Sequence, residues 1–283
     1  MLDNLTIWEK HPNNTGGVLI AAFEGWNDAG NASSWAIRHL RENFNAEPFA
    51  HIDAEQFYDF SETRPLVHLD EDGRQLDWPI TKFSTSSEQN ILLLEGIEPH
   101  LQWKTFVQEI TSIATSLDVS MVITLGSLLT EVPHTRPVMI YGFCEDAELS
   151  SRLNLQKSMY EGPTGIIGVL NQNIQEAGIP AISLWATVPN YVSGAASPKA
   201  TLALVNRLNE ILPEASLTTE LEIASASYER QVDQLIEDDE DMRAYVTDLE
   251  YRYDQGEFDA DPASGFGDRV ERWLHDGANP DEG

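Results

Sequence analysis

The chain has 283 residues, an apolar content of 41% and a formal charge of −30, from 17 basic and 47 acidic side chains. This length and composition fit a globular protein with one large or two ordinary domains, and they argue against a disordered or fibrous chain. The negative charge disfavours broad binding to nucleic acid or to anionic membranes, because both carry charge of the same sign.

The single cysteine, Cys144, allows no internal disulfide, which fits a reducing compartment. The first residues lack a basic segment followed by an apolar stretch, and no run of 18 apolar residues occurs anywhere in the chain. We therefore expect a cytoplasmic protein without a membrane segment.

The first predicted unit is a strand followed by a helix. Residues 18–23 form a continuous apolar run, which is typical of a short strand buried on both faces. Asn27 or Asp28 is the expected cap of the next helix, which carries apolar residues at helical spacing up to Leu40. Residues 49–60 and a hairpin that turns at Asp72-Gly73 then read as accessory or edge strands.

The strand-and-helix pattern then recurs along the chain. Apolar runs predict further strands, and segments with apolar residues at helical spacing predict helices between or after them. The expected strands are 90–96, 120–129, 138–144 and 181–188, and the expected helices are 101–117, 165–177 and 197–212. This alternation predicts an α/β fold with a mostly parallel sheet and helices on both faces.

Composition changes near Pro213, so we divide the chain into an α/β core domain, residues 1–213, and an acidic helical extension, residues 214–283. Two apolar stripes flank the acidic run 237–241, which predicts two antiparallel helices joined there. A short final helix is expected at 268–276. The acidic run is interpreted as a solvated turn, with an acidic docking patch as the alternative.

Polar clusters follow several predicted strands, at the sheet edge where open parallel sheets bind ligands. Their convergence would form one crevice. The candidate catalytic residues are Glu24, Asp28, Glu95, His134 and Arg136, and the candidate ligand contacts are Trp26, Asn27, Thr135, Gly162, Thr164, Gly165, Asn190 and Tyr191.

Each residue type suggests a role and an alternative to it. Arg136 suits bidentate capture of a carboxylate or phosphate, or a structural pair with an acid. The loop 162–165 suits an anion held by backbone N–H groups, or a plain helix start. Asp28 is a candidate acid or base, or a helix cap, and the aromatic residues are ring-stacking groups or core residues.

Several signatures of catalytic sites are missing from the sequence. There is no G-x-S-x-G nucleophile motif, no nucleotide-binding glycine pattern, and no H-E-x-x-H or C-x-x-C spacing. We therefore expect no metal site and no cofactor.

Taken together and in order, these motifs resemble the proteasome assembly chaperone 2 family. The similarity spans roughly residues 15–212. The matching pieces are Gly25-Trp-Asn-Asp-Ala-Gly30, Tyr58-Asp59, Arg64-Pro65, Leu94-Glu-Gly-Ile-Glu-Pro99 with Trp103, Pro133-His-Thr-Arg-Pro137, Tyr160-Glu-Gly-Pro-Thr-Gly165, Leu184-Trp185, Pro189-Asn-Tyr-Val192 and Ser197-Pro198.

The resemblance implies a three-layer α/β/α core of the phosphorylase/hydrolase type with a carboxyl-terminal helical extension. It also implies a homo-oligomer, with a trimer as one option, and a protein partner. Two features differ from the usual family pattern: Asn190 stands where histidine is common, and residues 279–283 lack the hydrophobic-Tyr-X tail of proteasome-binding chaperones.

These observations support two hypotheses. The first is a non-catalytic protein-binding or assembly-chaperone-like protein. The second is a small-molecule hydrolase or phosphorylase-like enzyme, which requires His134, Arg136, Asp28 and Thr164 to lie in one pocket.

Overall fold

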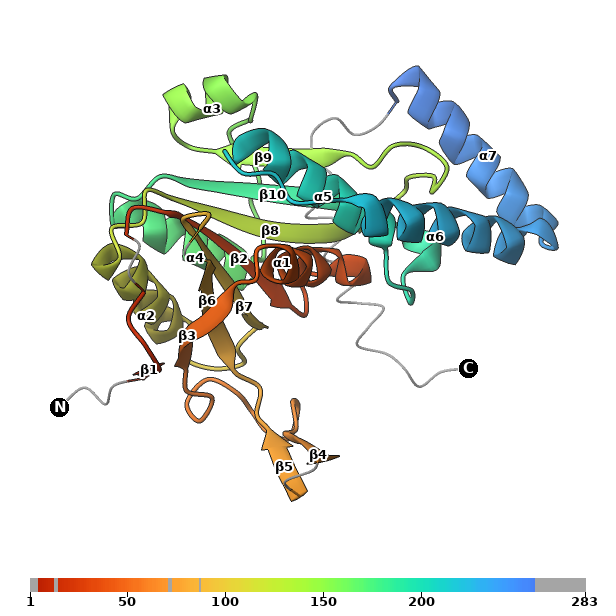
Figure 1. Cartoon of the computed structure of the whole chain (residues 1–283). Coiled ribbons are helices and arrows are strands. Elements are labelled where there is room, and N and C mark those ends of the chain that lie inside the picture. Colours follow the sequence, from red (N-terminus) through yellow and green to blue (C-terminus); the bar gives the residue numbers. More distant parts are fainter. Residues whose placement is uncertain (1–4, 13–14, 71–72, 87, 258–283) are drawn as a thin grey trace.

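The structure, a computed structural model, describes residues 5–12, 15–70, 73–86 and 88–257. Its centre is a sheet of eight strands in the order β1-β3-β6-β7-β2-β8-β10-β9, covered by helices (Figure 1). The strands of this sheet are β1 (Thr6–Trp8), β2 (Val18–Glu24), β3 (Glu47–Ile52), β6 (Thr81–Ser86), β7 (Ile91–Ile97), β8 (Met121–Thr130), β9 (Ile140–Cys144) and β10 (Ala181–Pro189).

The four central strands, β7, β2, β8 and β10, run parallel, and both flanks of the sheet are antiparallel. The α/β fold class expected from the alternating pattern is confirmed, and the parallel arrangement applies to the centre of a mixed sheet. Residues 49–60 were expected to form an accessory or edge strand. The strand found there, β3, lies inside the sheet between β1 and β6.

Helices cover both faces of the sheet because its central strands are apolar on both sides. In β2, Leu19 and Phe23 belong to the core under α2 and α4, and Ile20 and Ala22 belong to the core under α1 and α5. Successive strand residues point to opposite faces, so a continuous apolar run supplies both cores. These helices are α1 (Ala32–Asn43), α2 (Trp103–Ser116), α4 (Ile166–Glu176) and α5 (Pro198–Ile211).

A two-stranded hairpin projects from the body of the molecule (Figure 1). Strands β4 (Leu66–Asp70) and β5 (Gly73–Asp77) pair with each other, and among the described residues they pair with no strand of the large sheet. The cross-strand register places Val67 opposite Leu76, and Leu69 is 80% exposed. The hairpin therefore presents apolar side chains to solvent.

Helices α6 (Thr219–Glu237) and α7 (Glu240–Gln255) follow the core, and we call this pair the helical arm. They meet within the acidic run, where the Asp239 side chain accepts a hydrogen bond from the Met242 N–H and caps α7. From this junction α7 turns back and diverges from α6 as the second limb of a V (Figure 1). The expected final helix at 268–276 lies outside the described residues.

Three elements of the described chain were not expected from the sequence: the strands β1 and β6, and the short helix α3 (Ala147–Leu153), which Asp146 caps. Two single-turn helices, η1 (Ala29–Asn31) and η2 (Asn190–Val192), follow β2 and β10. Within the described part of the chain, no helix has the length and apolar character needed to cross a membrane.

Candidate functional site

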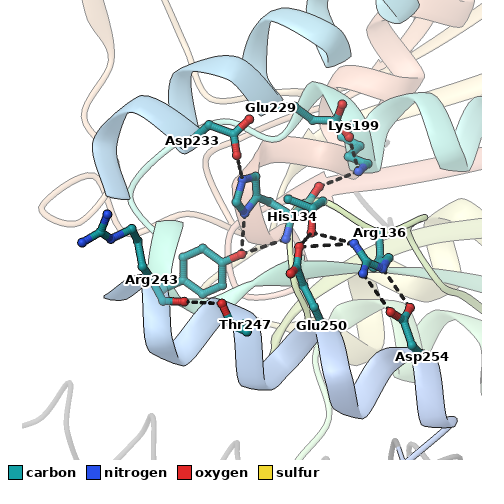
Figure 2. Close-up of polar contacts among 11 residues, drawn as sticks. His134, Arg136, Lys199, Glu229, Asp233, Arg243, Thr247, Glu250 and Asp254 are labelled. Atoms are coloured by element: carbon teal, nitrogen blue, oxygen red, sulfur yellow. Dashed lines mark hydrogen bonds and ion pairs between the residues drawn. The ribbon is translucent and has the colours of Figure 1, made fainter. Parts of the chain in front are cut away.

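The parallel strands β2, β8 and β10 end at one edge of the sheet, so the loops that follow them lie along a common rim. Residues 131–137 follow β8, and we call them the anchor loop. Figure 2 shows that the polar residues of this loop meet side chains of α6 and α7.

His134 is buried in the anchor loop, where its side chain makes two polar contacts and its backbone N–H makes a third. The Tyr191 hydroxyl oxygen lies 2.7 Å from the His134 backbone N and 2.8 Å from Nδ1, and Asp233 Oδ1 of α6 lies 3.0 Å from Nε2. The carboxylate can only accept from Nε2–H, and the tyrosine that accepts the backbone N–H can donate to Nδ1. Both ring nitrogens of His134 thus have hydrogen-bond partners.

Tyr191 can donate to His134 Nδ1 because its hydroxyl stays protonated. Burial raises the pKa of the Tyr191 hydroxyl well above its ordinary value. Lys199 of α5 holds the other side of the loop, since its Nζ donates to the His134 carbonyl and pairs with Glu229 of α6. The loop is therefore fastened to both α5 and α6.

Arg136 joins the loop to α7. Its Nε and Nη2 each lie 2.8 Å from an oxygen of Asp254, and Nη1 lies 3.2 Å from Glu250 Oε1. Thr135 also donates to Glu250. The hydrogen bonds to Asp254 raise the pKa of the Arg136 guanidinium and lower the pKa of the Asp254 carboxyl.

The cavity beside His134 and Arg136 has a volume of about 10 Å³. Such a space accommodates about one water molecule and no substrate. The contacts of His134, Thr135 and Arg136 therefore attach the arm to the core. In this structure Arg136 forms a structural pair with acidic side chains, which was the alternative to capture of a ligand anion.

The loop before α4, which suited either a bound anion or a plain helix start, holds a carboxylate of this chain. Glu98 Oε1 accepts from the Ile166 backbone N–H at 2.7 Å and from Asn27 Nδ2 at 3.0 Å. The helix N-terminus, which favours negative charge, is thus occupied by a carboxylate of this chain. A Cβ at Gly165 would lie 2.3 Å from Asn27 Oδ1, so this contact requires glycine.

The remaining candidate carboxylates have structural partners. Asp28 Oδ1 accepts hydrogen bonds from the N–H groups of Ser33 and Ser34, at 2.8 and 3.2 Å, at the start of α1. Asp28 therefore caps a helix in this structure, which was the alternative to a role as a catalytic acid or base. Glu24 and Glu95 pair with two arginines of the same helix, Arg38 and Arg41 respectively.

The structure does not bring the candidate residues into one crevice. His134 and Arg136 lie at the arm, Asp28 lines a pocket of about 750 Å³, and Thr164 lines another of about 520 Å³. Trp26 lines both larger pockets. Gly162 lies in the exposed turn before α4, and Asn190 is exposed at the start of η2, next to Tyr191.

The arm residues Asp233, Glu250 and Asp254 were not predicted from the sequence as partners of the anchor loop. Glu250 and Asp254 are four residues apart on α7, a spacing that places both on one helix face. This spacing was the feature of the sequence that could have indicated an acidic helix face able to bind an arginine. Within the described residues, no group of three or more His, Cys, Asp or Glu side chains is arranged to hold a metal ion.

Comparison with known proteins assigns the chain to a family. The model of the PAC2 family matches residues 22–236. The chain belongs to the PAC2 family. This confirms the family resemblance carried by the strand-end motifs.

Solved structures of similar proteins agree with the fold. A PAC2 family protein from Streptomyces avermitilis is 43% identical, with a TM-score of 0.75, over 81% of this chain and 99% of that chain. A proteasome-assembly chaperone homologue from Mycobacterium tuberculosis is 38% identical, with a TM-score of 0.74 and the same coverage. An M. tuberculosis protein of unknown function is 26% identical, with a TM-score of 0.79, over 90% of this chain and 92% of that chain. No curated protein matches the sequence.

Proposed function

We propose that this PAC2 protein is a non-catalytic, assembly-chaperone-like protein that binds a protein partner through its helical arm. The anchor loop supports this proposal, because its candidate catalytic residues hold the arm and are not gathered around a substrate pocket. His134, Thr135 and Arg136 are engaged by Asp233, Glu250 and Asp254 of the arm. The proteasome-assembly chaperone homologue that is 38% identical supports the same class of function.

The arm has a surface suited to a basic partner. The residues around its junction, including Glu237, Asp238 and Glu240, are acidic and exposed. Such a cluster attracts a positively charged surface and speeds encounter with it. Ile223 and Leu235 are also exposed on α6 and supply apolar contact area beside the charges.

Self-association and a cytoplasmic location belong to the same proposal. A homo-oligomer, with a trimer as one option, would cover the apolar hairpin side chains Val67, Leu69 and Leu76. An isolated two-stranded hairpin is only marginally stable in water, so burial of this face would stabilise it. We divide the chain functionally into the core, residues 1–213, and the arm-bearing extension, residues 214–283.

The experiment is recovery of partners from native lysate at physiological salt. The wild-type chain is compared with a variant carrying Glu237→Gln, Asp238→Asn and Glu240→Gln. A matched control carries Glu55→Gln, Glu62→Gln and Glu148→Gln, which removes the same charge from exposed positions elsewhere. We expect one stoichiometric protein partner with the wild type and the control, and loss of that partner with the arm variant.

Two results would contradict the proposal. One is equal recovery of the partner by the arm variant. The other is the absence of any stoichiometric partner together with turnover of a small molecule, which would favour the hydrolase or phosphorylase alternative.

A further inference from the structure

The two larger pockets share a wall of side chains. Trp26, Leu128 and Trp185 line both, so the pockets adjoin along the carboxyl-terminal rim of the sheet. We call them the aromatic pocket, about 520 Å³, and the turn pocket, about 750 Å³. Both volumes lie within the range of small-molecule sites.

The aromatic pocket is rich in rings at one end of the sheet. Tyr141 and Phe143 of β9 and Tyr160 join the two shared tryptophans. Gly126 lets the Trp185 ring lie against β8, since a Cβ there would be 2.6 Å from the ring. The ring orientation is fixed further by a hydrogen bond of 2.8 Å from Trp185 Nε1 to Ser183 Oγ.

The charged side chains that line the two pockets are all negative. Among the described residues that line them, Asp28 and Glu145 are the charged side chains, one in each pocket, and no Lys, Arg or His contributes. Glu145 pairs with Lys157 at 2.9 Å, and that lysine is 69% exposed. A surface pair of this kind contributes little, so a cationic ligand can replace it.

Two residues that line the pockets also carry a buried oxygen atom without a hydrogen-bond donor. Asp28 is 6% exposed, and its Oδ2 has no partner among the described residues, although Oδ1 caps α1. Asn171 Oδ1 is likewise buried and unpartnered, while the Asn171 Nδ2 donates to Thr124 and to Ile167. Both oxygens are closed to solvent, so they favour a cation in the pockets through their negative potential and not through a direct hydrogen bond.

We propose that the adjoining pockets bind a linear organic cation with an amino group at each end, a diamine or polyamine. One ammonium group lies in the turn pocket near the negative charge of Asp28, and the other meets the accessible carboxylate of Glu145 in the aromatic pocket. The methylene chain passes over Trp26 and Trp185, where aromatic rings attract ammonium groups and pack against alkyl chains. This site is independent of the protein partner proposed for the arm.

Calorimetric titration with spermidine tests the proposal in the full chain at physiological salt. Butylamine, with one amino group, and 1,4-butanediol, with none, serve as ligand controls. We expect saturable one-to-one binding of spermidine, at least tenfold weaker binding of butylamine, and no heat from butanediol. Failure of spermidine to bind, or equal binding of the uncharged diol, would overturn the proposal.

Variants separate the site from general attraction to an acidic protein. Glu145→Gln and Glu148→Gln each remove one charge, but Glu148 lines neither pocket. We expect Glu145→Gln to weaken spermidine binding about fivefold or more, and Glu148→Gln to leave it unchanged. Equal effects of the two variants would show non-specific attraction and would refute the site.

A third variant narrows the turn pocket without removing charge. Gly194 lines that pocket, and a Cβ there meets no atom within 4 Å, so Gly194→Leu is compatible with the fold. We expect this variant to weaken spermidine binding while its melting temperature stays unchanged. Undiminished binding would exclude the turn pocket from the site.

Discussion

His134 is a buried hydrogen-bonding residue whose two ring nitrogens both have partners. We expect His134→Ala to lower the free energy of unfolding by about 2–4 kcal/mol, because it opens a cavity and leaves buried polar groups unpaired. His68→Ala on the exposed hairpin is the control, with an expected change within about 0.5 kcal/mol. Urea unfolding measures both; equal effects would place His134 outside the packing of the arm.

The Arg136–Asp254 pair makes stability depend on pH. The arginine holds the folded-state pKa of Asp254 below its ordinary value of 3.8. The contribution of the pair is therefore fully present above the unfolded-state pKa and is lost as the pH falls through the lowered folded-state pKa. We expect the stability difference between wild type and Asp254→Asn to be constant from about pH 5 to pH 7 and to shrink below about pH 4. A difference that grew on acidification would contradict this assignment.

At the scale of elements, the joint between β2, the loop after β7 and α4 depends on close approach at Gly165. Because a Cβ there would overlap Asn27, we expect Gly165→Ala to destabilise the fold by about 1–3 kcal/mol. Gly194→Ala, where the added Cβ meets no atom within 4 Å, should be neutral or slightly stabilising. Thermal unfolding of both variants measures the difference, and an unchanged melting temperature for Gly165→Ala would contradict the joint.

The central elements were predictable because their signals are local. The apolar run at residues 18–23 is continuous, residues 181–188 are mostly apolar, and the capping pair Ser197-Pro198 starts α5 as expected. The helix α3 was missed because it is short and buries a single residue, Leu149, so it has no apolar stripe.

The candidate site was harder to predict than the elements that carry it. Strand ends do share a rim, but this rim is several strands wide, and neighbours along it need not share a pocket. The partners of the anchor loop, from Asp233 to Asp254, lie about a hundred residues away in sequence. Only the low number of basic residues suggested that Arg136 would pair with an acid. The hydrogen bond between Glu98 and the first residue of α4 was equally hard to predict, because it joins residues that are distant in the sequence.

At the scale of the whole molecule, the exposed hairpin provides a test of self-association. We expect Leu69→Glu to lower the mass of the oligomer in light scattering, because it places charge on an apolar face that a second copy would cover. Leu217→Glu is the matched control, since Leu217 is 79% exposed on another part of the surface. If both variants keep the wild-type mass, or if the wild type is a monomer, the hairpin is not a contact between copies.

The anchor loop attaches the helical arm to the core. Hydrogen exchange of α7 in Arg136→Ala, compared with wild type and with Arg74→Ala on the hairpin, measures this attachment. We expect faster exchange along α7 in Arg136→Ala, with the amides of α2 and α4 unchanged and with no effect of Arg74→Ala. If the amides of α7 in Arg136→Ala kept the protection they have in the wild type, Arg136 of the anchor loop would not hold the arm to the core.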